Sequence, residues 1–231
     1  MDIQFNNLRQ EKDAIGVVFC DNNCRLIGYG KKLDQLSKKY ISNIIKSDIS
    51  FQERNSKNFD YSIIHQPANL KLSKLYVFKL KNFKDYQIRD FQVLGGHLNS
   101  LIKFYKETNV IVYPDGISSS KVGSLNAISE MILGMSLASY SFTKYFSKKD
   151  DKKNKNKTKK KKIKIYSSQH TRLAKNYESI SAIHQGVTLT RNLVTEPPNV
   201  MTPPKIAEYA KSLSEHGVDV QAVSYTHLTL P

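Results

Sequence analysis

The sequence is poor in cysteine and has no long apolar segment. Its only cysteines, Cys20 and Cys24, are too few for the disulfide framework of a small secreted protein, and a C-x₃-C pair without nearby histidine is a weak metal motif. The longest apolar runs are about eight residues, as at Met131–Ala138 when Gly134 and Ser136 are counted in, whereas a membrane-spanning helix needs roughly 20. The polar N-terminus has no signal-peptide core. We therefore expect reduced thiols, no membrane contact and a cytoplasmic protein.

Several catalytic signatures are also missing. Gly28-Tyr29-Gly30 lacks the third glycine of a dinucleotide-binding loop, and Ser118–Ser120 do not form a G-x-S-x-G nucleophile elbow. No two histidines have the spacing of zinc ligands; they are His65, His97, His170, His184, His216 and His227. We predict that this chain contains no catalytic, no metal-binding and no substrate-binding residue.

Acidic residues are scarce, and the net charge is +16. Residues 148–164 alone hold 11 lysines and two aspartates. Such a block repels itself and favours a solvated Lys-rich loop, assigned to 148–162, in which Asp150-Asp151 balances charge locally. A nucleic-acid contact through counterion release is the alternative. It is not favoured, because the segment has no arginine for bidentate contacts and no aromatic ring for base stacking.

Apolar patterns alternate between strand and helix through residue 168. Strands are predicted at 14–20, 74–80, 109–114 and 163–168, and helices at 32–46, 87–106 and from Leu125 to Phe142. Little is assigned between residues 50 and 72. The alternation predicts an α/β domain over residues 1–168, with a parallel or mixed sheet and flanking helices.

Two proline pairs interrupt the chain after a further helix predicted at 169–195. Proline disfavours helical geometry in the preceding residue, so Glu196–Met201 is expected to be an extended connector. Thr202 is suited to be the N-cap of a new helix with Pro203 at its first position, and Gly217 is suited to end it. The alternating residues Val218–Ala222 then predict a strand.

That strand has no partner in the remaining sequence. Residues 196–222 are therefore expected to be the truncated start of a second α/β domain, reached through the inter-domain helix 169–195. Residues 223–231 do not continue this pattern. We interpret "SYTHLTLP" (Ser224–Pro231) as a non-native tail, in which His227 has no function.

Two segments carry a family resemblance. "GVTLTRNLVTEPPNVMTPPKIAEYAKSL" (Gly186–Leu213) resembles the entry to the catalytic domain of leucyl (cytosol) aminopeptidases, and "GMSLASYSFTKYFSKK" (Gly134–Lys149) resembles a helix end in their N-terminal domain. The two occur in the family's order, whereas residues 1–125 offer no signature.

The resemblance implies a macro-domain-like N-terminal domain followed by a metallopeptidase domain. It implies a cytoplasmic homohexamer that uses two divalent ions, manganese or zinc, to remove N-terminal residues from peptide substrates. The family's Asp-Ser-Gly-Gly and Asp-Ala-Glu-Gly-Arg motifs are absent from this sequence. No catalytic residue is carried over, and Arg191 and Asn192 are expected to anchor the domain junction. The chain is expected to be an inactive N-terminal fragment that ends just inside the catalytic domain.

Two other functions remain open from the sequence. The first is a non-catalytic macro-like module that contacts nucleic acid or a nucleotide through the basic loop, and this binding would weaken steeply with salt. The second is a natural remnant that assembles without catalysis. Its unpaired apolar strand would be an aggregation hazard, which counts against this hypothesis.

Overall fold

The structure is a computed structural model, and it describes residues 2–53, 59–145 and 162–223. The chain divides into two compact units, Met1–His184 and Gln185–Pro231. Within the described ranges no helix has the length and apolar character needed to cross a membrane.

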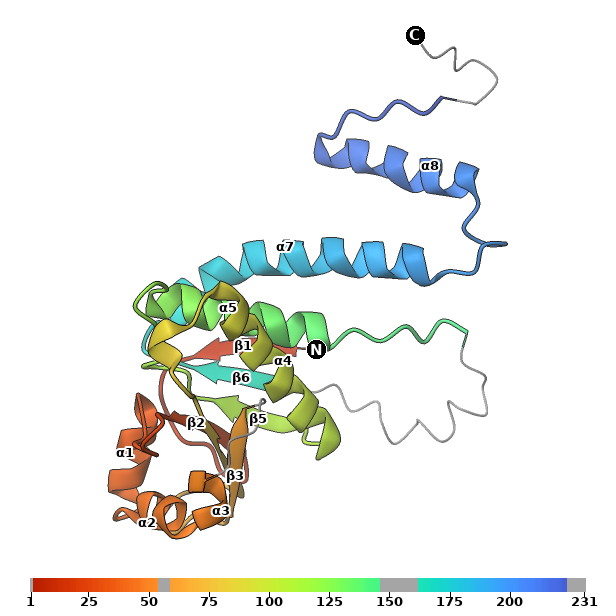
Figure 1. Cartoon of the computed structure of the whole chain (residues 1–231). Coiled ribbons are helices and arrows are strands. Elements are labelled where there is room, and N and C mark those ends of the chain that lie inside the picture. Colours follow the sequence, from red (N-terminus) through yellow and green to blue (C-terminus); the bar gives the residue numbers. More distant parts are fainter. Residues whose placement is uncertain (1, 54–58, 146–161, 224–231) are drawn as a thin grey trace. The chain divides into compact units, whose positions relative to one another are not determined.

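The first unit is built on a six-stranded sheet (Figure 1) with the order β1-β6-β5-β2-β4-β3. Four neighbouring pairs are parallel, and only β3 runs antiparallel to β4. The strands are β1 (Asp2–Asn6), β2 (Ile15–Cys20), β3 (Asp60–His65), β4 (Lys74–Lys79), β5 (Asn109–Val112) and β6 (Lys162–Tyr166). The mixed sheet expected from the sequence is therefore confirmed.

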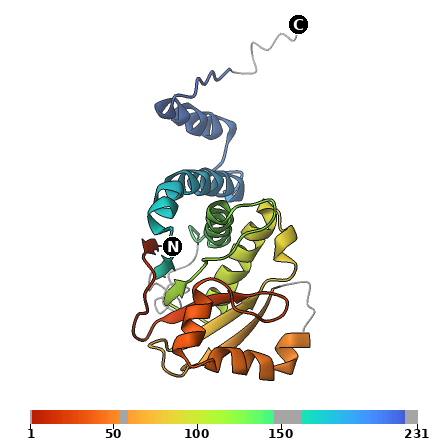
Figure 2. The same ribbon diagram turned by 90° about the vertical axis from the view of Figure 1, so that its left-hand side faces the viewer.

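Side chains alternate between two buried layers, one on each face of the sheet. Val17 and Phe19 of β2 face one layer, and Val18 and Cys20 face the other. The first layer is covered by α4 (Ile88–Phe104), α5 (Ser124–Ala138) and the start of α7 (His170–Thr195); the second is covered by α1 (Tyr29–Leu36), α2 (Tyr40–Ser47) and α3 (Ile49–Glu53). Figure 2 shows these layers from the side.

Residues 7–14 form a return loop across the second face. Because β1 and β2 belong to the parallel part of the sheet, the chain must travel from the carboxyl end of β1 back to the amino end of β2. The loop contributes Leu8 and Ala14 to the second layer. It therefore packs on the second face over β5 and β6, which α1–α3 do not cover.

The prediction of one helix at 32–46 is wrong. This segment forms two helices separated by Ser37–Lys39, and both Lys38 and Lys39 have positive φ angles, 55° and 62°. The carboxylate of Asp34 accepts the backbone N–H of Ser42 at 2.9 Å, which stabilises the break. This side-chain hydrogen bond thus interrupts the helix, although the apolar residues keep a helical spacing across the break.

The helix predicted to reach Phe142 ends earlier, at Ala138. The hydroxyl of Ser139 donates to the carbonyl of Ser136 at 2.7 Å, so Ser139 closes the helix and does not continue its apolar stripe. Two strands were missed, β1 and β3. In both, apolar residues alternate with polar ones, but the segments are short, and β3 has two adjacent isoleucines that obscure the period.

The second unit contains α8 (Pro203–Ser212) and a short 3-10 helix, η3 (Leu213–His216). Thr202 is extended at the N-cap and prolines follow it, as predicted, although its side chain makes no capping hydrogen bond. Gly217 ends η3 with a φ of 81°, which confirms the predicted terminator.

Two predictions for this unit are wrong. The connector is not extended, because the N–H groups of Val200 and Met201 both donate to the carbonyl of Pro197 at 2.9 Å and close a turn. Residues 218–222 form no strand, since no other strand is available to pair with them among the described residues.

Candidate functional site at the carboxyl edge of the sheet

The carboxyl ends of β2, β5 and β6 meet at one edge of the sheet. After β2 the chain continues to β3 and β4 on one side, and after β5 it continues to β6 on the other. Open α/β sheets bind ligands in the crevice at such a topological switch point. The loops at residues 21–28, 113–117 and 167–169 form this crevice, which makes it the place to look for a site in the first unit.

The loops after β2 and β5 pack main chain against main chain. Gly28 has a φ of 53°, and a Cβ at this position would lie 1.6 Å from the carbonyl oxygen of Asp115. Gly116 has a φ of 89°, and a Cβ there would lie 2.8 Å from the backbone nitrogen of Gly28. Only glycine meets both the backbone angle and the close approach. The crevice is therefore closed at this point by the chain itself.

Three tyrosine rings fill the space beside this crossing. Tyr29 and Tyr113 stack with centroids 4.8 Å apart, and Tyr166 meets Tyr113 edge-on at 5.9 Å. Tyr113 is only 1% exposed, and burial raises the pKa of its hydroxyl above the ordinary value. The three rings therefore pack against one another within the second buried layer.

Asp115 accepts hydrogen bonds from the turn that leads from β6 into α7. One carboxylate oxygen accepts the hydroxyl of Ser167, and the other accepts the backbone N–H of Ser168 at 2.9 Å. The Ser167 hydroxyl oxygen in turn accepts the N–H of Gln169 at 3.0 Å. These hydrogen bonds hold the turn between β6 and α7, and we call this contact the Asp115 latch.

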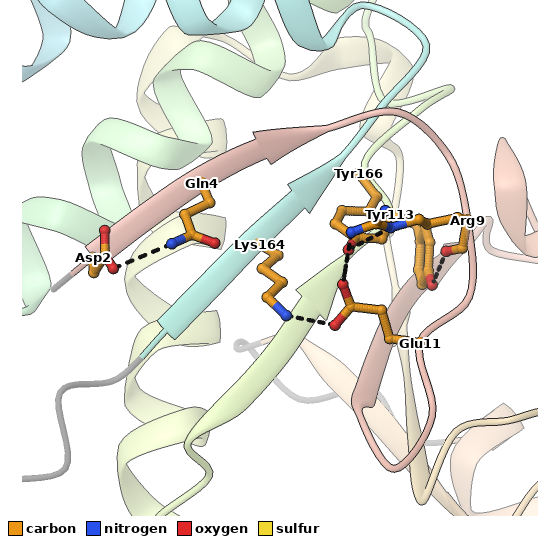
Figure 3. Close-up of polar contacts among 7 residues, drawn as sticks. All are labelled: Asp2, Gln4, Arg9, Glu11, Tyr113, Lys164 and Tyr166. Atoms are coloured by element: carbon orange, nitrogen blue, oxygen red, sulfur yellow. Dashed lines mark hydrogen bonds and ion pairs between the residues drawn. The ribbon is translucent and has the colours of Figure 1, made fainter.

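A polar network holds the return loop on β6 (Figure 3). Arg9 Nε donates to the hydroxyl of Tyr166 at 3.1 Å, and that hydroxyl donates to Glu11. Lys164 forms an ion pair with the same carboxylate, and the Tyr113 hydroxyl donates to the carbonyl of Arg9 at 2.8 Å.

The network leaves Glu11 ionised and fully engaged. Burial alone would raise its pKa, but the hydrogen bonds from Lys164 and Tyr166 outweigh that effect and lower it. The pKa of Tyr166 is raised, first by burial and then by its bond to Glu11. A carboxylate that accepts from Lys164, Tyr166 and Arg9 is a poor general base. The arrangement is suited to fix the loop, not to perform proton transfer.

The residues that were singled out in the sequence are divided between this edge, where Gly28, Tyr29, the two cysteines and His170 lie, and other parts of the first unit. Ser119 and Ser120 lie in the loop before α5, where their hydroxyls donate to the carbonyls of Tyr86 and Lys84. His170 lies at the start of α7, with Nδ1 3.2 Å from the carbonyl of Ser167. Among the described residues no group of three His, Cys, Asp or Glu could hold a metal ion.

Both cysteines are free and buried, as expected, one at the end of β2 and the other in the following turn. Burial raises the pKa of both thiols, so neither is an activated nucleophile. Asp150-Asp151, most of the Lys-rich loop, and His227 with the tail 224–231 lie outside the described residues.

Sequence reasoning missed the residues that actually meet at the edge. Arg9, Glu11 and Asp115 belong to polar segments next to strands, which gave no motif to search for. Their position directly after β1 and β5 was the available signal, because strand ends in parallel sheets converge. This position could not be recognised for Arg9 and Glu11, because β1 itself was not predicted.

The comparisons with known proteins identify the chain. A protein of Rhizobium leguminosarum bv. trifolii, named "Probable cytosol aminopeptidase", is 31% identical to it over 158 residues, which is 68% of this chain. The chain belongs to the cytosol aminopeptidase family. It spans about a third, 31%, of the length of this curated relative. No protein-family model matches the sequence.

Solved structures agree on the fold of this chain. A mutant of tomato leucine aminopeptidase superposes with a TM-score of 0.64 at 18% identity, covering 94% of this chain and 42% of that one. A bottromycin maturation enzyme in complex with Mn gives 0.51 at 10% identity, covering 90% and 38%. A mutant macrodomain of Oceanobacillus iheyensis gives 0.54 at 8% identity, covering 78% and 92%. The predicted macro-domain-like fold is confirmed.

Proposed function

We propose that this chain is the N-terminal part of a leucyl aminopeptidase that removes N-terminal residues from peptides. In this proposal the whole protein works in the cytoplasm as a homohexamer with two divalent ions, manganese or zinc. The observation that carries the proposal is the 31% identity to a cytosol aminopeptidase over 158 residues. The superposition with an enzyme solved in complex with Mn is consistent with metal dependence of the family fold.

The described residues do not fit a metal centre of this kind. They contain no cluster of three potential ligands, and the two thiols are buried with raised pKa values. A metal ion that activates water needs several oxygen or nitrogen ligands and an open position. We therefore assign no step of peptide hydrolysis to a residue of this chain. The role proposed for its first unit is to support the catalytic domain.

The exposed apolar residues of the second unit support the proposal that catalysis belongs to a separate domain. None of the residues of α8 is buried, and apolar side chains along it are exposed, including Ile206 at 51%. Val194 at the end of α7 is 80% exposed. An apolar stripe of this kind is typical of a helix that packs against a further domain. In the proposal, that domain is the metallopeptidase domain.

The test begins with the native coding sequence past the codon for Ala222. The product it encodes should hydrolyse leucine amide in the presence of manganese and lose this activity with a chelator. The 231-residue chain, purified in parallel, should show no hydrolysis. A complete product that fails to hydrolyse leucine amide at any divalent ion would overturn the aminopeptidase proposal and leave the binding module or the remnant.

The binding-module alternative has its own measurement. Phosphate contacts by the lysine-rich segment would give binding to DNA or RNA that falls steeply between about 50 and 200 mM salt. Absence of binding even at the lower salt concentration would reject the module.

A further inference from the structure

A pocket lined mainly by aromatic side chains lies in the first unit, between α4 and strands β3 and β4. Its volume is about 330 Å³, at the lower end of the range typical of small-molecule sites. It is lined by Phe59, Tyr61, Phe78, His97, Ser100, Leu101, Phe104 and Tyr105. None of these residues belongs to the carboxyl edge, the Asp115 latch or the network around Glu11.

The secondary structure explains why these side chains converge. Tyr61 of β3 pairs directly with Phe78 of β4, and their rings lie 5.9 Å apart on the face that α4 covers. His97, Leu101 and Phe104 follow a spacing of four and three residues, which places them on one face of α4. The two strands and one face of α4 therefore place several aromatic rings side by side around the pocket.

The residue composition of the pocket lining is unusual for this chain. The protein has 36 Lys and Arg and 20 Asp and Glu, yet none of the eight lining residues carries a carboxylate, an ammonium or a guanidinium. A phosphate or carboxylate ligand would find no cation there to pair with. The Phe59 and His97 rings meet at 66°, and those of Phe104 and Tyr105 at 86°. Rings in such edge-to-face sets attract a further ring.

One polar group is placed to orient such a ring. The Ser100 hydroxyl donates to the carbonyl of Gly96 at 3.0 Å, which leaves its oxygen able to accept a hydrogen bond. The hydroxyls of Tyr61 and Tyr105 lie 3.4 Å apart. Phe104 is 77% exposed, so one face of this large ring is available to a ligand.

We propose that this pocket binds a small, uncharged, planar aromatic molecule of one or two fused rings that carries a ring N–H. The ring packs among Phe59, Phe78 and Phe104, and the N–H donates to Ser100. This site is independent of the proposed aminopeptidase activity, and it binds its ligand in the first unit alone.

Indole is the probe for the test. The chain contains no tryptophan, so indole fluorescence can be followed without a background from tryptophan in the protein. Titration of the 231-residue chain into indole should give saturable binding with a Kd on the order of 1 mM or below. Transferred NMR signals should place the ring next to aromatic protons of the protein. Absence of saturation over a range of chain concentrations that would resolve a Kd on the order of 1 mM overturns the proposal.

Variants locate the site. Phe104→Ala removes an exposed ring, so the fold should be retained, and the Kd should rise about three- to ten-fold. Tyr40→Ala, an exposed aromatic on α2 outside the pocket, is the matched control and should leave the Kd unchanged. Ser100→Ala should weaken indole binding but not binding of N-methylindole, which has no N–H to donate. Equal affinity of wild type and Phe104→Ala for indole would show that the ligand binds elsewhere.

Discussion

Asp115 is a single residue that joins three parts of the carboxyl edge. Its backbone carbonyl packs on Gly28, and its carboxylate accepts from Ser167 and Ser168 at the start of α7. Asp115→Ala removes the acceptors of two hydrogen bonds and should cost about 1–3 kcal/mol of unfolding free energy. Asp115→Asn retains one acceptor oxygen and should cost less, about 0.5–1.5 kcal/mol.

Chemical denaturation and hydrogen exchange of the Ser168 amide measure the effect of these two variants. Faster exchange in Asp115→Ala than in Asp115→Asn is expected. If both variants unfold and exchange like wild type, the Asp115 latch contributes nothing to the start of α7.

Buried tyrosines should make the first unit sensitive to alkali. Burial raises the pKa of Tyr113, Tyr76 and Tyr86 in the folded state. The unfolded chain therefore loses these protons first, at about pH 10, and the free energy of unfolding falls as pH rises beyond that value. Each such tyrosine contributes a slope of about 1.4 kcal/mol per pH unit until its folded pKa is reached.

Denaturant unfolding measured at intervals from pH 8 to strongly alkaline solution tests this dependence. Tyr113→Phe retains the ring and removes the titrating group, so the alkaline slope should become shallower. The variant also loses the bond to the Arg9 carbonyl, which lowers stability at every pH. The slope is therefore the decisive quantity, and an unchanged slope would contradict the assignment.

At the level of elements, α4 and α5 approach through glycine. A Cβ at Gly95 would lie 1.9 Å from the carbonyl oxygen of Met131, and one at Gly134 would lie 1.9 Å from that of Gln92. Gly95→Ala and Gly134→Ala should each destabilise the first unit by about 1–3 kcal/mol or more, because the helices must separate. Gly96→Ala is the matched control, with its nearest neighbour, the Ala138 side chain, at 3.9 Å.

Thermal unfolding distinguishes the three alanine variants. Gly96→Ala should be neutral or stabilising by up to about 1 kcal/mol, since alanine favours a helix interior and has room there. A similar loss for all three would mean that helix propensity or the unfolded state, not close packing, determines the result.

Elements with a strong period and a clear stop were predictable from the sequence. The strand at β2, the helices α4 and α7 and the terminator Gly217 follow apolar spacing and turn residues, which act locally. The break at Ser37–Lys39 and the turn after Pro197 were not predictable in this way, because they depend on particular hydrogen bonds to Asp34 and Pro197. The carboxyl edge could not be assembled either, since its residues come from segments far apart in the chain.

At the scale of the whole molecule, the first unit should fold and melt without a contribution from the second. The first has two buried layers around a sheet, whereas α8 buries none of its residues. A fragment of residues 1–195 should therefore melt within about 2 °C of the 231-residue chain, because a loss of 1 kcal/mol would shift the midpoint by more than this in a unit of this size. The longer chain should bind more of a dye that reports exposed apolar surface.

Differential scanning fluorimetry and dye binding on both lengths give the comparison. A large drop in the melting temperature of the fragment would show that residues 196–231 stabilise the first unit. Equal dye binding by the two lengths would show that the apolar side chains of α8 are covered in solution.

The return loop also affects the order in which the molecule can fold. In the part of the chain that the structure describes, β1 pairs only with β6, and the loop that follows β1 is held by a hydrogen bond between residues 155 positions apart, Glu11 and Tyr166. Contacts of such long sequence separation slow folding, because the intervening chain must first be ordered. During synthesis the N-terminal strand has to wait unpaired until β6 has emerged from the ribosome. Strand β1 is therefore made well before the strand that it needs for pairing.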